Sequence, residues 1–361
     1  MWIEMESEIE KRIDRLQIII DEWLHPGNYD LKKAIDKTVN ERFFSFEDIK
    51  HQLLVFKKTL NKRDLLRWAE PLKRTLSNQK KKRILCLHAG NIPLVGLQDL
   101  LAVLISGDHY TGKISRKDPY LLPTILKKLQ REGFVKKDEW STDLAELPEI
   151  SADAVLFSGS TESVDVVFNR LVSLKLVKKQ TPALVRTAHF SIAFIEDSLP
   201  DTMDQLTQAV LRYGGKGCRS VAMVVAPFSL HSQKCHFTDY IEKFFLAVPQ
   251  HEKAPPSLYQ RYAYNKSVGI EQAWLDNFLI EETEMEPSEP FILHWVKGGK
   301  DTLTKLVDRY KNGLQTVYVK DPSVEIEGIE TELLIDAQQP PIYWQPDGVD
   351  TISWLNNLDE Q

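Results

Sequence analysis

The sequence predicts an α/β protein with a helical layer at its amino end, a doubly wound domain and a second α/β domain. From about residue 83 to residue 197, short apolar runs alternate with helical patterns, as they do in successive βαβ units. The length of 361 residues also exceeds what one hydrophobic core usually holds, which favours two domains of about 100–200 residues. We therefore expect a first domain over residues 1–190, a second over 191–335 and a C-terminal return segment over 336–361.

The first 76 residues are predicted to form helices. Ile13, Leu16, Ile20 and Trp23 recur at three- and four-residue steps, and a Pro-Gly-Asn sequence after them interrupts the pattern. Charge is segregated along the chain: residues 57–83 hold eleven Lys or Arg, whereas residues 321–361 hold ten acidic residues and no Lys or Arg. A solvated helix face explains the basic stretch, and a surface that docks an anion or a partner is the alternative.

The doubly wound region is predicted from its apolar runs. Buried strands are expected at 84–90, 109–115, 152–160 and 191–197, with helices at 94–106, 119–131 and 163–176. In such folds ligands gather at the carboxyl ends of the strands, so the loops that follow the strands are expected to hold binding residues.

The second domain is predicted to begin with a helix at 202–213. Asp201 is expected to cap this helix, and Gly214-Gly215 to end it. A buried strand is expected at 220–228. Later elements are harder to assign; strands are expected at 290–296 and 315–319, a helix at 300–312 and an irregular return at 338–348.

Composition excludes several classes of protein. The chain has 46 basic and 52 acidic residues, a net charge of −6, which argues against binding nucleic acid or an anionic membrane through the overall field. Its three cysteines, Cys86, Cys218 and Cys235, are too few and too irregularly spaced for a disulfide framework, so we expect a reducing cytoplasm. The longest apolar stretch, 93–107, is broken by polar residues, and no membrane insertion is expected.

Two motifs resemble known sites but lack essential parts. Residues 107–113 fit the phosphate-binding pattern GxxxxGK, yet Ile114 stands where Ser or Thr should bind Mg²⁺, and the segment runs from a helix end into a strand. Residues 231–236 (HSQKCH) contain zinc-ligand types without a second ligand pair. We expect neither an NTPase nor a metal site, and no GxGxxG dinucleotide motif is present.

Cys218 is the strongest candidate nucleophile. It follows three glycines in the sequence Tyr-Gly-Gly-Lys-Gly-Cys-Arg-Ser, where a backbone without Cβ atoms lets a substrate approach the thiol. The preceding helix presents its negative end, so Lys216, Arg219 or the surroundings of a bound cofactor would have to lower the thiol pKa. The alternative is a small residue that merely fits a tight turn.

Four short segments, taken in their order along the chain, resemble the motifs of a known family. They are Gly90-Asn91-Ile92-Pro93, Lys113-Ile114-Ser115-Arg116-Lys117-Asp118-Pro119, Phe157-Ser158-Gly159-Ser160-Thr161 and Gly215-Lys216-Gly217-Cys218. They resemble the Asn-x-Pro, Lys-Pro-Ser-Glu, Phe-Thr-Gly-Ser-Thr and Gly-Gln-x-Cys motifs of aldehyde dehydrogenases. The stretches LHAGNIPLVGLQDLL and RYGGKGCRS are most similar to the long-chain acyl-CoA reductases of bacterial bioluminescence systems. This resemblance, over about residues 84–226, implies an aldehyde dehydrogenase-like fold with a cofactor-binding domain and a catalytic domain.

The resemblance implies catalytic roles for two residues. Cys218 would attack the thioester carbonyl of a fatty acyl-CoA, form an acyl-enzyme and release CoA. The Asn91 amide and the backbone N–H of Cys218 would stabilise the oxyanion, an effect worth about 3 kcal/mol in comparable sites. Hydride from a nicotinamide would then give the aldehyde.

The resemblance also implies a cofactor site. Lys113 would contact the adenosine ribose, Gly159 and Ser160 would hold the pyrophosphate, and Ser115 and Arg116 would complete the site. NAD-preferring members carry Glu at the position of Arg116, and a guanidinium suits a 2′-phosphate, so we expect NADPH rather than NADH. The alternative is an exposed Arg116 without cofactor contact.

Departures from the family pattern bear on the reaction. Oxidising members carry a Glu-Leu-Gly-Gly-Lys segment before the cysteine, whereas residues 184–190 here contain no carboxylate to activate water, which favours acyl-CoA reduction. Aldehyde oxidation on the same fold and a catalytically silent binding scaffold are the alternatives. The Glu-x-Phe-Gly-Pro segment that grips the nicotinamide ribose is not found; 286–291 is a poor match. The donor could be acyl-CoA or an acyl carrier protein, and a homo-oligomer, dimer or tetramer, is expected.

Overall fold

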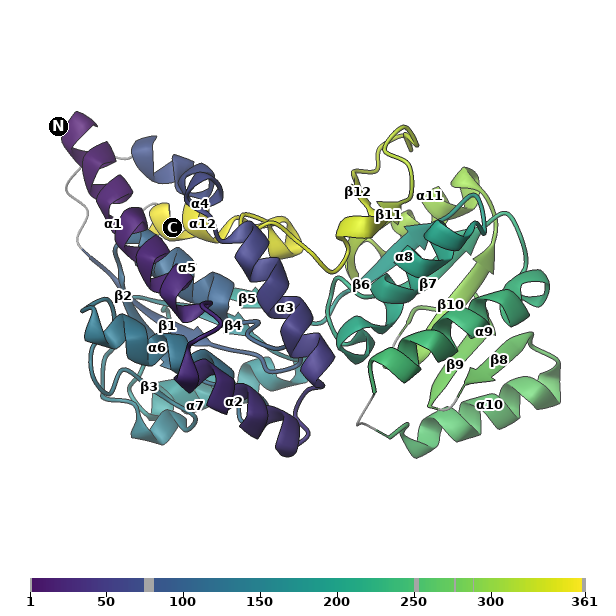
Figure 1. Cartoon of the computed structure of the whole chain (residues 1–361), viewed down its shortest axis with the longest axis horizontal. Helices are drawn as coiled ribbons and strands as arrows, with labels where there is room; N and C mark the ends of the chain where they lie inside the picture. Colours follow the sequence, from purple (N-terminus) through teal and green to yellow (C-terminus); the bar gives the residue numbers. More distant parts are fainter. Residues whose placement is uncertain (1, 75–80, 250–252, 276, 288, 359–361) are drawn as a thin grey trace. The chain divides into compact units, whose positions relative to one another are not determined.

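The contacts within the chain divide it into two units (Figure 1). The computed structural model describes residues 2–74, 81–249, 253–275, 277–287 and 289–358. The first unit comprises residues up to 187 together with those from 340 onward, and the second unit comprises residues 188–339. The C-terminal return segment therefore belongs to the first unit from residue 340. No helix in the described part of the chain is both long and apolar enough to cross a membrane.

A five-stranded parallel sheet lies at the centre of the first unit, in the order β3-β2-β1-β4-β5. Its strands are β1 (Arg83–Leu87), β2 (His109–Lys113), β3 (Trp140–Ser141), β4 (Ala154–Ser158) and β5 (Ala183–Arg186). The chain runs outward from β1 to β3 and then returns to the other side of β1. The strand order therefore reverses between β1 and β4, and this is the point at which doubly wound sheets bind ligands.

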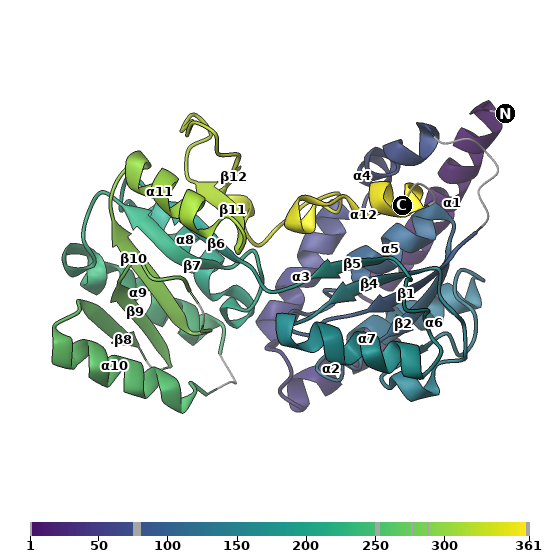
Figure 2. The same ribbon diagram turned by 180° about the vertical axis from the view of Figure 1, so that it is seen from behind.

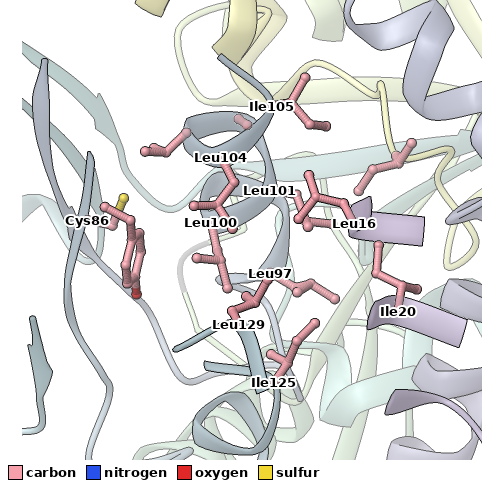
Figure 3. Packing of buried hydrophobic residues seen from close by; sticks show 14 of the residues in the cluster. Leu16, Ile20, Cys86, Leu97, Leu100, Leu101, Leu104, Ile105, Ile125 and Leu129 are labelled. Atoms are coloured by element: carbon pink, nitrogen blue, oxygen red, sulfur yellow. The ribbon is translucent and has the colours of Figure 1, made fainter. Parts of the chain in front are cut away.

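Alternate residues of the strands cover opposite faces of this sheet. Ile84 and Cys86 pack with α5 (Leu97–Ser106), whereas Leu85 and Leu87 pack with residues of α7 (Val164–Ser173). Figure 2 shows α7 on the near face of the sheet. Figure 3 shows the leucines of α5 between Cys86 and two residues of the first helix, Leu16 and Ile20. The region predicted as doubly wound thus has helices on both faces.

The helical layer covers the α5 face. It consists of α1 (Trp2–Trp23), α2 (Tyr29–Asn40), α3 (Phe46–Thr59) and α4 (Lys62–Trp68), together with α6 (Leu121–Arg131) and the C-terminal α12 (Thr351–Asn356). The predicted apolar face of the first helix is confirmed, because Ile13, Leu16, Ile20 and Trp23 are fully buried.

The second unit is built on a seven-stranded sheet in the order β12-β11-β6-β7-β10-β9-β8, in which β8 alone is antiparallel to its neighbour. The strands are β6 (Phe190–Phe194), β7 (Val221–Ala226), β8 (Gln272–Leu275), β9 (Phe278–Glu282), β10 (Ile292–Lys297), β11 (Leu314–Val319) and β12 (Thr331–Leu333). The helices are α8 (Pro200–Leu211), α9 (Leu230–Ala247), α10 (Pro256–Val268) and α11 (Lys300–Tyr310).

The start of α8 differs from the predicted one. Leu199 is the N-cap and Pro200 occupies the first turn, where its missing N–H costs nothing. At the start of α8, the carboxylate of Asp197 accepts hydrogen bonds from the N–H of Leu199 (2.9 Å) and the hydroxyl of Thr202 (2.6 Å). The predicted capping role of Asp201 is therefore wrong; its side chain accepts from Gln205 within the helix.

Candidate active site

The loop that carries Asn91 joins β1 to α5 and is tied to the loop after β2. The N–H of Leu94, which has a left-handed φ of 59°, donates to one carboxylate oxygen of Asp118 at 2.8 Å. The other oxygen accepts from the N–H of Leu121 at 3.3 Å, at the start of α6. Asp118 is 4% exposed, so one buried carboxylate joins the two segments that the sequence analysis assigned to oxyanion and ribose binding.

Gly90 and Ser115 bring the same two loops into contact. A Cβ at Gly90 would lie 2.2 Å from the Ser115 hydroxyl oxygen, so only glycine fits this position. That hydroxyl accepts from the N–H of Lys117 at 3.2 Å, and Ser115 is 8% exposed. Ser115 therefore supports its own loop, and its predicted contact with the cofactor stays a prediction.

Lys113 ends β2, and Arg116 follows in the loop beyond it. A terminal nitrogen of Arg116 lies 3.3 Å from a carboxylate oxygen of Asp143, and both side chains are substantially exposed. The other oxygen of Asp143 accepts from the N–H of Ala145 at 3.0 Å, which fixes the carboxylate. Burial lowers the pKa of Lys113, as does the charge of Arg116. Sequence reasoning missed Asp143, because 27 residues separate it from Arg116.

Gly159 and Ser160 follow β4, across the reversal in strand order from Asn91. The N–H of Gly159 donates to the carbonyl of Arg186 at 3.1 Å, within the sheet. This amide is therefore not directed at a pyrophosphate. A Cβ at Gly159 would lie 2.6 Å from the ring of Phe157, so the missing side chain makes room for that ring. Ser160 precedes a short 3₁₀ turn, and its predicted role is untested.

Burial changes the pKa of Asp118. It raises the pKa of this carboxyl to about 6, although the N–H groups of Leu94 and Leu121 act to lower it. The folded protein thus holds the proton more tightly than the unfolded chain, so stability from this group is complete below its ordinary pKa and is lost as the pH rises through about 6.

Asp118→Asn removes this titrating group. We expect the difference in the free energy of unfolding between the wild type and this variant to fall by about 1.3 kcal/mol between pH 5 and pH 7. Urea unfolding at a series of pH values measures this difference. Asp108, whose pKa burial also raises to about 6, titrates in both proteins and cancels. A difference that stays constant or grows with pH would contradict the raised pKa of Asp118.

Cys218 lies at the amino end of β7, in a turn of four residues. The N–H of Ser220 donates to the carbonyl of Gly217 at 2.8 Å, which closes the turn around Cys218. A trans peptide places its C=O and N–H on opposite sides, and no cis peptide is present among the described residues. Since the carbonyl of Gly217 points into the turn, the N–H of Cys218 points out of it. Cys218 is a partly exposed residue.

The chain reaches this turn through three consecutive residues in the left-handed region. They are Tyr213 (φ 59°), Gly214 (φ 67°) and Gly215 (φ 68°), and a Cβ at Gly215 would also lie 3.0 Å from the carbonyl oxygen of Val210. Left-handed backbone favours glycine, so the glycine-dense sequence is explained by this reversal of direction between α8 and β7.

Arg219, one of the groups expected to lower the thiol pKa of Cys218, is paired with an acidic residue. Its guanidinium lies 2.9 Å from the carboxylate of Glu332 and is 7% exposed. Its effect on the thiol stays a prediction. Cys86, in contrast to Cys218, is fully buried, and burial raises its thiol pKa. Cys86 is therefore a residue of the core.

The two incomplete motifs take other roles. Gly107 ends α5 with a left-handed φ of 84°, and Gly112 lies inside β2, so residues 107–113 form no phosphate loop. His231 contacts the carboxylate of Glu271 at 3.1 Å. The side chain of Cys235 lies outside the described residues. Where side chains are described, no three His, Cys, Asp or Glu residues are grouped to hold a metal ion.

Sequence comparison and structure comparison give different results. No family model matches the sequence, and no curated protein matches it at a significant level. Solved structures do match: methylmalonate-semialdehyde dehydrogenase from Oceanimonas doudoroffii is 14% identical, with a TM-score of 0.59 over 95% of this chain and 84% of that one. An aldehyde dehydrogenase from Mycobacterium tuberculosis, complexed with NAD⁺, is 12% identical, with a TM-score of 0.56 over 86% and 73%.

A third structure, the substrate-bound AldH of Staphylococcus aureus, is 11% identical, with a TM-score of 0.57 over 93% of this chain and 82% of that one. The chain has the aldehyde dehydrogenase fold. At such low identity the likeness establishes the fold alone, and it confirms the predicted α/β class. Within the aldehyde dehydrogenase fold, Asn91, Lys113, Ser115, Arg116, Gly159 and Ser160 lie in the first unit and Cys218 in the second.

Proposed function

We propose that this protein is an NADPH-dependent acyl-CoA reductase that converts a long-chain fatty acyl-CoA to the aldehyde. The observation that carries the proposal is the turn at Cys218, where a partly exposed cysteine has an N–H that points out of the turn. The absence of a carboxylate from residues 184–190 supports reduction over oxidation, because an acyl-enzyme that meets no activated water survives until hydride arrives.

In the proposed reaction, the Cys218 sulfur attacks the thioester carbonyl carbon. A C–S bond to Cys218 forms, the C–S bond to CoA breaks, and the thiol proton leaves with CoA. The N–H of Cys218 donates to the oxyanion. The resemblance assigns the role of a second donor to the side-chain amide of Asn91. When bound, NADPH supplies the hydride that reduces the acyl group. Cys218 then departs as a thiolate and the aldehyde is released.

The residues of the first unit suit a phosphorylated dinucleotide. Loops after β1, β2 and β4 surround the reversal in strand order, where such folds bind nucleotides. Lys113 and Arg116 bring two positive charges to the end of β2 and the loop beyond it. Gly90 and Gly159, in the other two loops, make room for the side chains of Ser115 and Phe157. NADPH is proposed over NADH because Arg116 can donate two parallel hydrogen bonds to a 2′-phosphate.

Asp143 makes this preference testable. We expect Arg116→Ala to weaken NADPH binding about tenfold and NADH binding little, because it removes charged hydrogen bonds that only a 2′-phosphate accepts. We expect Asp143→Asn to strengthen NADPH binding about threefold, since its carboxylate competes for the same guanidinium. Fluorescence titration with both cofactors measures the effect.

The control is Glu146→Gln. It removes a carboxylate from the same loop, but one that accepts from Ser141 rather than Arg116. The ratio of the NADPH and NADH dissociation constants should not change in this variant. Equal changes for both cofactors in Arg116→Ala would contradict a contact with the 2′-phosphate.

The proposed function is tested by following NADPH absorbance in mixtures with acyl-CoAs of increasing chain length. We expect oxidation of NADPH that depends on both acyl-CoA and protein, and an aldehyde product identified by mass spectrometry. NADP⁺ reduction by free aldehyde without CoA would instead support aldehyde oxidation. No turnover with acyl-CoA or acyl carrier protein thioesters in either direction would contradict both reactions and favour a silent scaffold. Sedimentation of the same protein tests the proposed homo-oligomer.

A further inference from the structure

Two side chains, one from a neighbouring strand and one from the turn itself, hold the peptide that follows Cys218. The hydroxyl of Ser191, a fully buried residue of β6, donates to the carbonyl oxygen of Cys218 at 2.8 Å. β6 pairs directly with β7, so this support comes from the neighbouring strand of the central sheet. The carbonyl orientation of the residue that carries the thiol is thus set by a rigid element.

Arg219 holds the other end of this peptide. Its Nε donates to the carbonyl of Ala337 at 2.8 Å, and a terminal nitrogen lies 2.9 Å from both the carbonyl of Asp336 and the carboxylate of Glu332. A planar guanidinium satisfies three acceptors only in one orientation. The ring of Tyr318 on β11 lies 5.5 Å from the guanidinium carbon. Arg219 therefore ties the turn to residues 332–337, more than 100 positions along the chain.

The arrangement suits positioning of the turn. The charge of Arg219 is opposed by Glu332, and its N–H groups are directed at the carbonyls of Asp336 and Ala337. What the contacts fix is the backbone of the turn, which carries both the Cys218 side chain and the N–H of Cys218. An attacking sulfur and an oxyanion donor must meet the same carbonyl group, and small errors in such geometry are costly.

We propose that Ser191 and Arg219 are positioning residues for acyl transfer, which hold the backbone at Cys218, and with it the N–H of Cys218, in the orientation that a thioester carbonyl requires. This inference rests on the proposed function of Cys218 as the nucleophile. It predicts that loss of either contact slows acyl transfer, because acyl transfer passes through an oxyanion. Alkylation of the same sulfur forms no oxyanion, so its rate should stay nearly unchanged.

The test compares two reactions of one thiol in Ser191→Ala and in Arg219→Lys. Single-turnover release of CoA from acyl-CoA, without NADPH, measures the rate of acyl transfer. The rate of alkylation of Cys218 by iodoacetamide, followed by mass spectrometry of the peptide, measures the reactivity of the thiol itself. We expect acyl transfer to fall about 10- to 100-fold in each variant and alkylation to change by less than about threefold. Because a lysine ammonium cannot span three acceptors, Arg219→Lys keeps the charge and loses the geometry.

The control is Thr207→Ala, which removes another buried hydroxyl that donates to a backbone carbonyl, within α8. It should leave both rates unchanged. Parallel losses of acyl transfer and alkylation, or no loss of either, would contradict the positioning role alone. No CoA release from the wild type would contradict the proposed function together with this inference. CoA release at the same rate in the wild type and in both variants would contradict only the inference.

Discussion

Replacement of Cys218 with Ala is expected to lower acyl-CoA reduction at least about 1,000-fold, because the acyl-enzyme cannot form without the sulfur. NADPH affinity should stay within about twofold of the wild-type value, since the proposed cofactor residues lie in the first unit and Cys218 in the second. Steady-state NADPH oxidation and fluorescence titration measure the two quantities.

The matched control is Cys86→Ala. Both variants remove one thiol, but Cys86 is fully buried in the core of the first unit. Its loss should lower stability by about 1 kcal/mol and leave the activity of the folded protein intact. Activity that persists in Cys218→Ala, or that disappears in Cys86→Ala while the protein remains folded, would contradict Cys218 as the nucleophile.

The second large effect is expected on stability, from Arg186→Ala. A terminal nitrogen of Arg186 lies 2.6 Å from the carboxylate of Asp99 on α5, and the other donates to the Thr351 hydroxyl at 2.7 Å. The two charged side chains are 10% and 8% exposed. Removal of the guanidinium leaves a buried carboxylate without its counter-charge, so urea unfolding should show a loss of about 3–5 kcal/mol.

A second ion pair supplies the comparison. Arg116→Ala breaks an exposed pair, which should cost less than about 1 kcal/mol. The double variant Arg186→Ala with Asp99→Ala should be more stable than the sum of the single losses predicts, because no charge is then left alone. Losses of similar size from Arg186→Ala and Arg116→Ala would contradict this account.

Periodic patterns were sufficient to predict much of the fold. The spacing of Ile13, Leu16 and Ile20 defined a helix, and short apolar runs defined β1, β2, β4, β6 and β7, because packing itself produces these periods. β5 was missed because it is four residues long at the edge of its sheet, with Val185 exposed. Short edge strands carry little periodic signal.

Two helices of the second unit were missed for different reasons. In α10 the described buried residues are only Leu258 and Asn265, and Tyr259 and Tyr264 are exposed, so no apolar stripe exists to detect. In α9 the buried positions 237, 241 and 244 do recur at helical spacing, and this signal could have been read from the sequence.

The candidate site was predictable to the extent that it is local in sequence. Short motifs located Asn91 and Cys218 on loops and Lys113 at the end of a strand, because glycines and strand ends mark such positions. The charged partners could not be predicted, since a pair such as Arg219 with Glu332 joins residues far apart in the chain, and each charge alone resembles any surface charge. Only the tertiary structure brings them together.

The insertion of the second unit into the first dictates an order of synthesis. A ribosome completes all of residues 188–339 before it adds the residues from 340 onward that finish the first unit. Until then Arg186 lacks the hydroxyl of Thr351, and the indole N–H of Trp68 lacks the carboxylate of Asp350, its acceptor at 2.9 Å. The inserted unit is therefore complete in sequence while part of the core of the first unit, which residues 342–358 help to cover, is still without its partners.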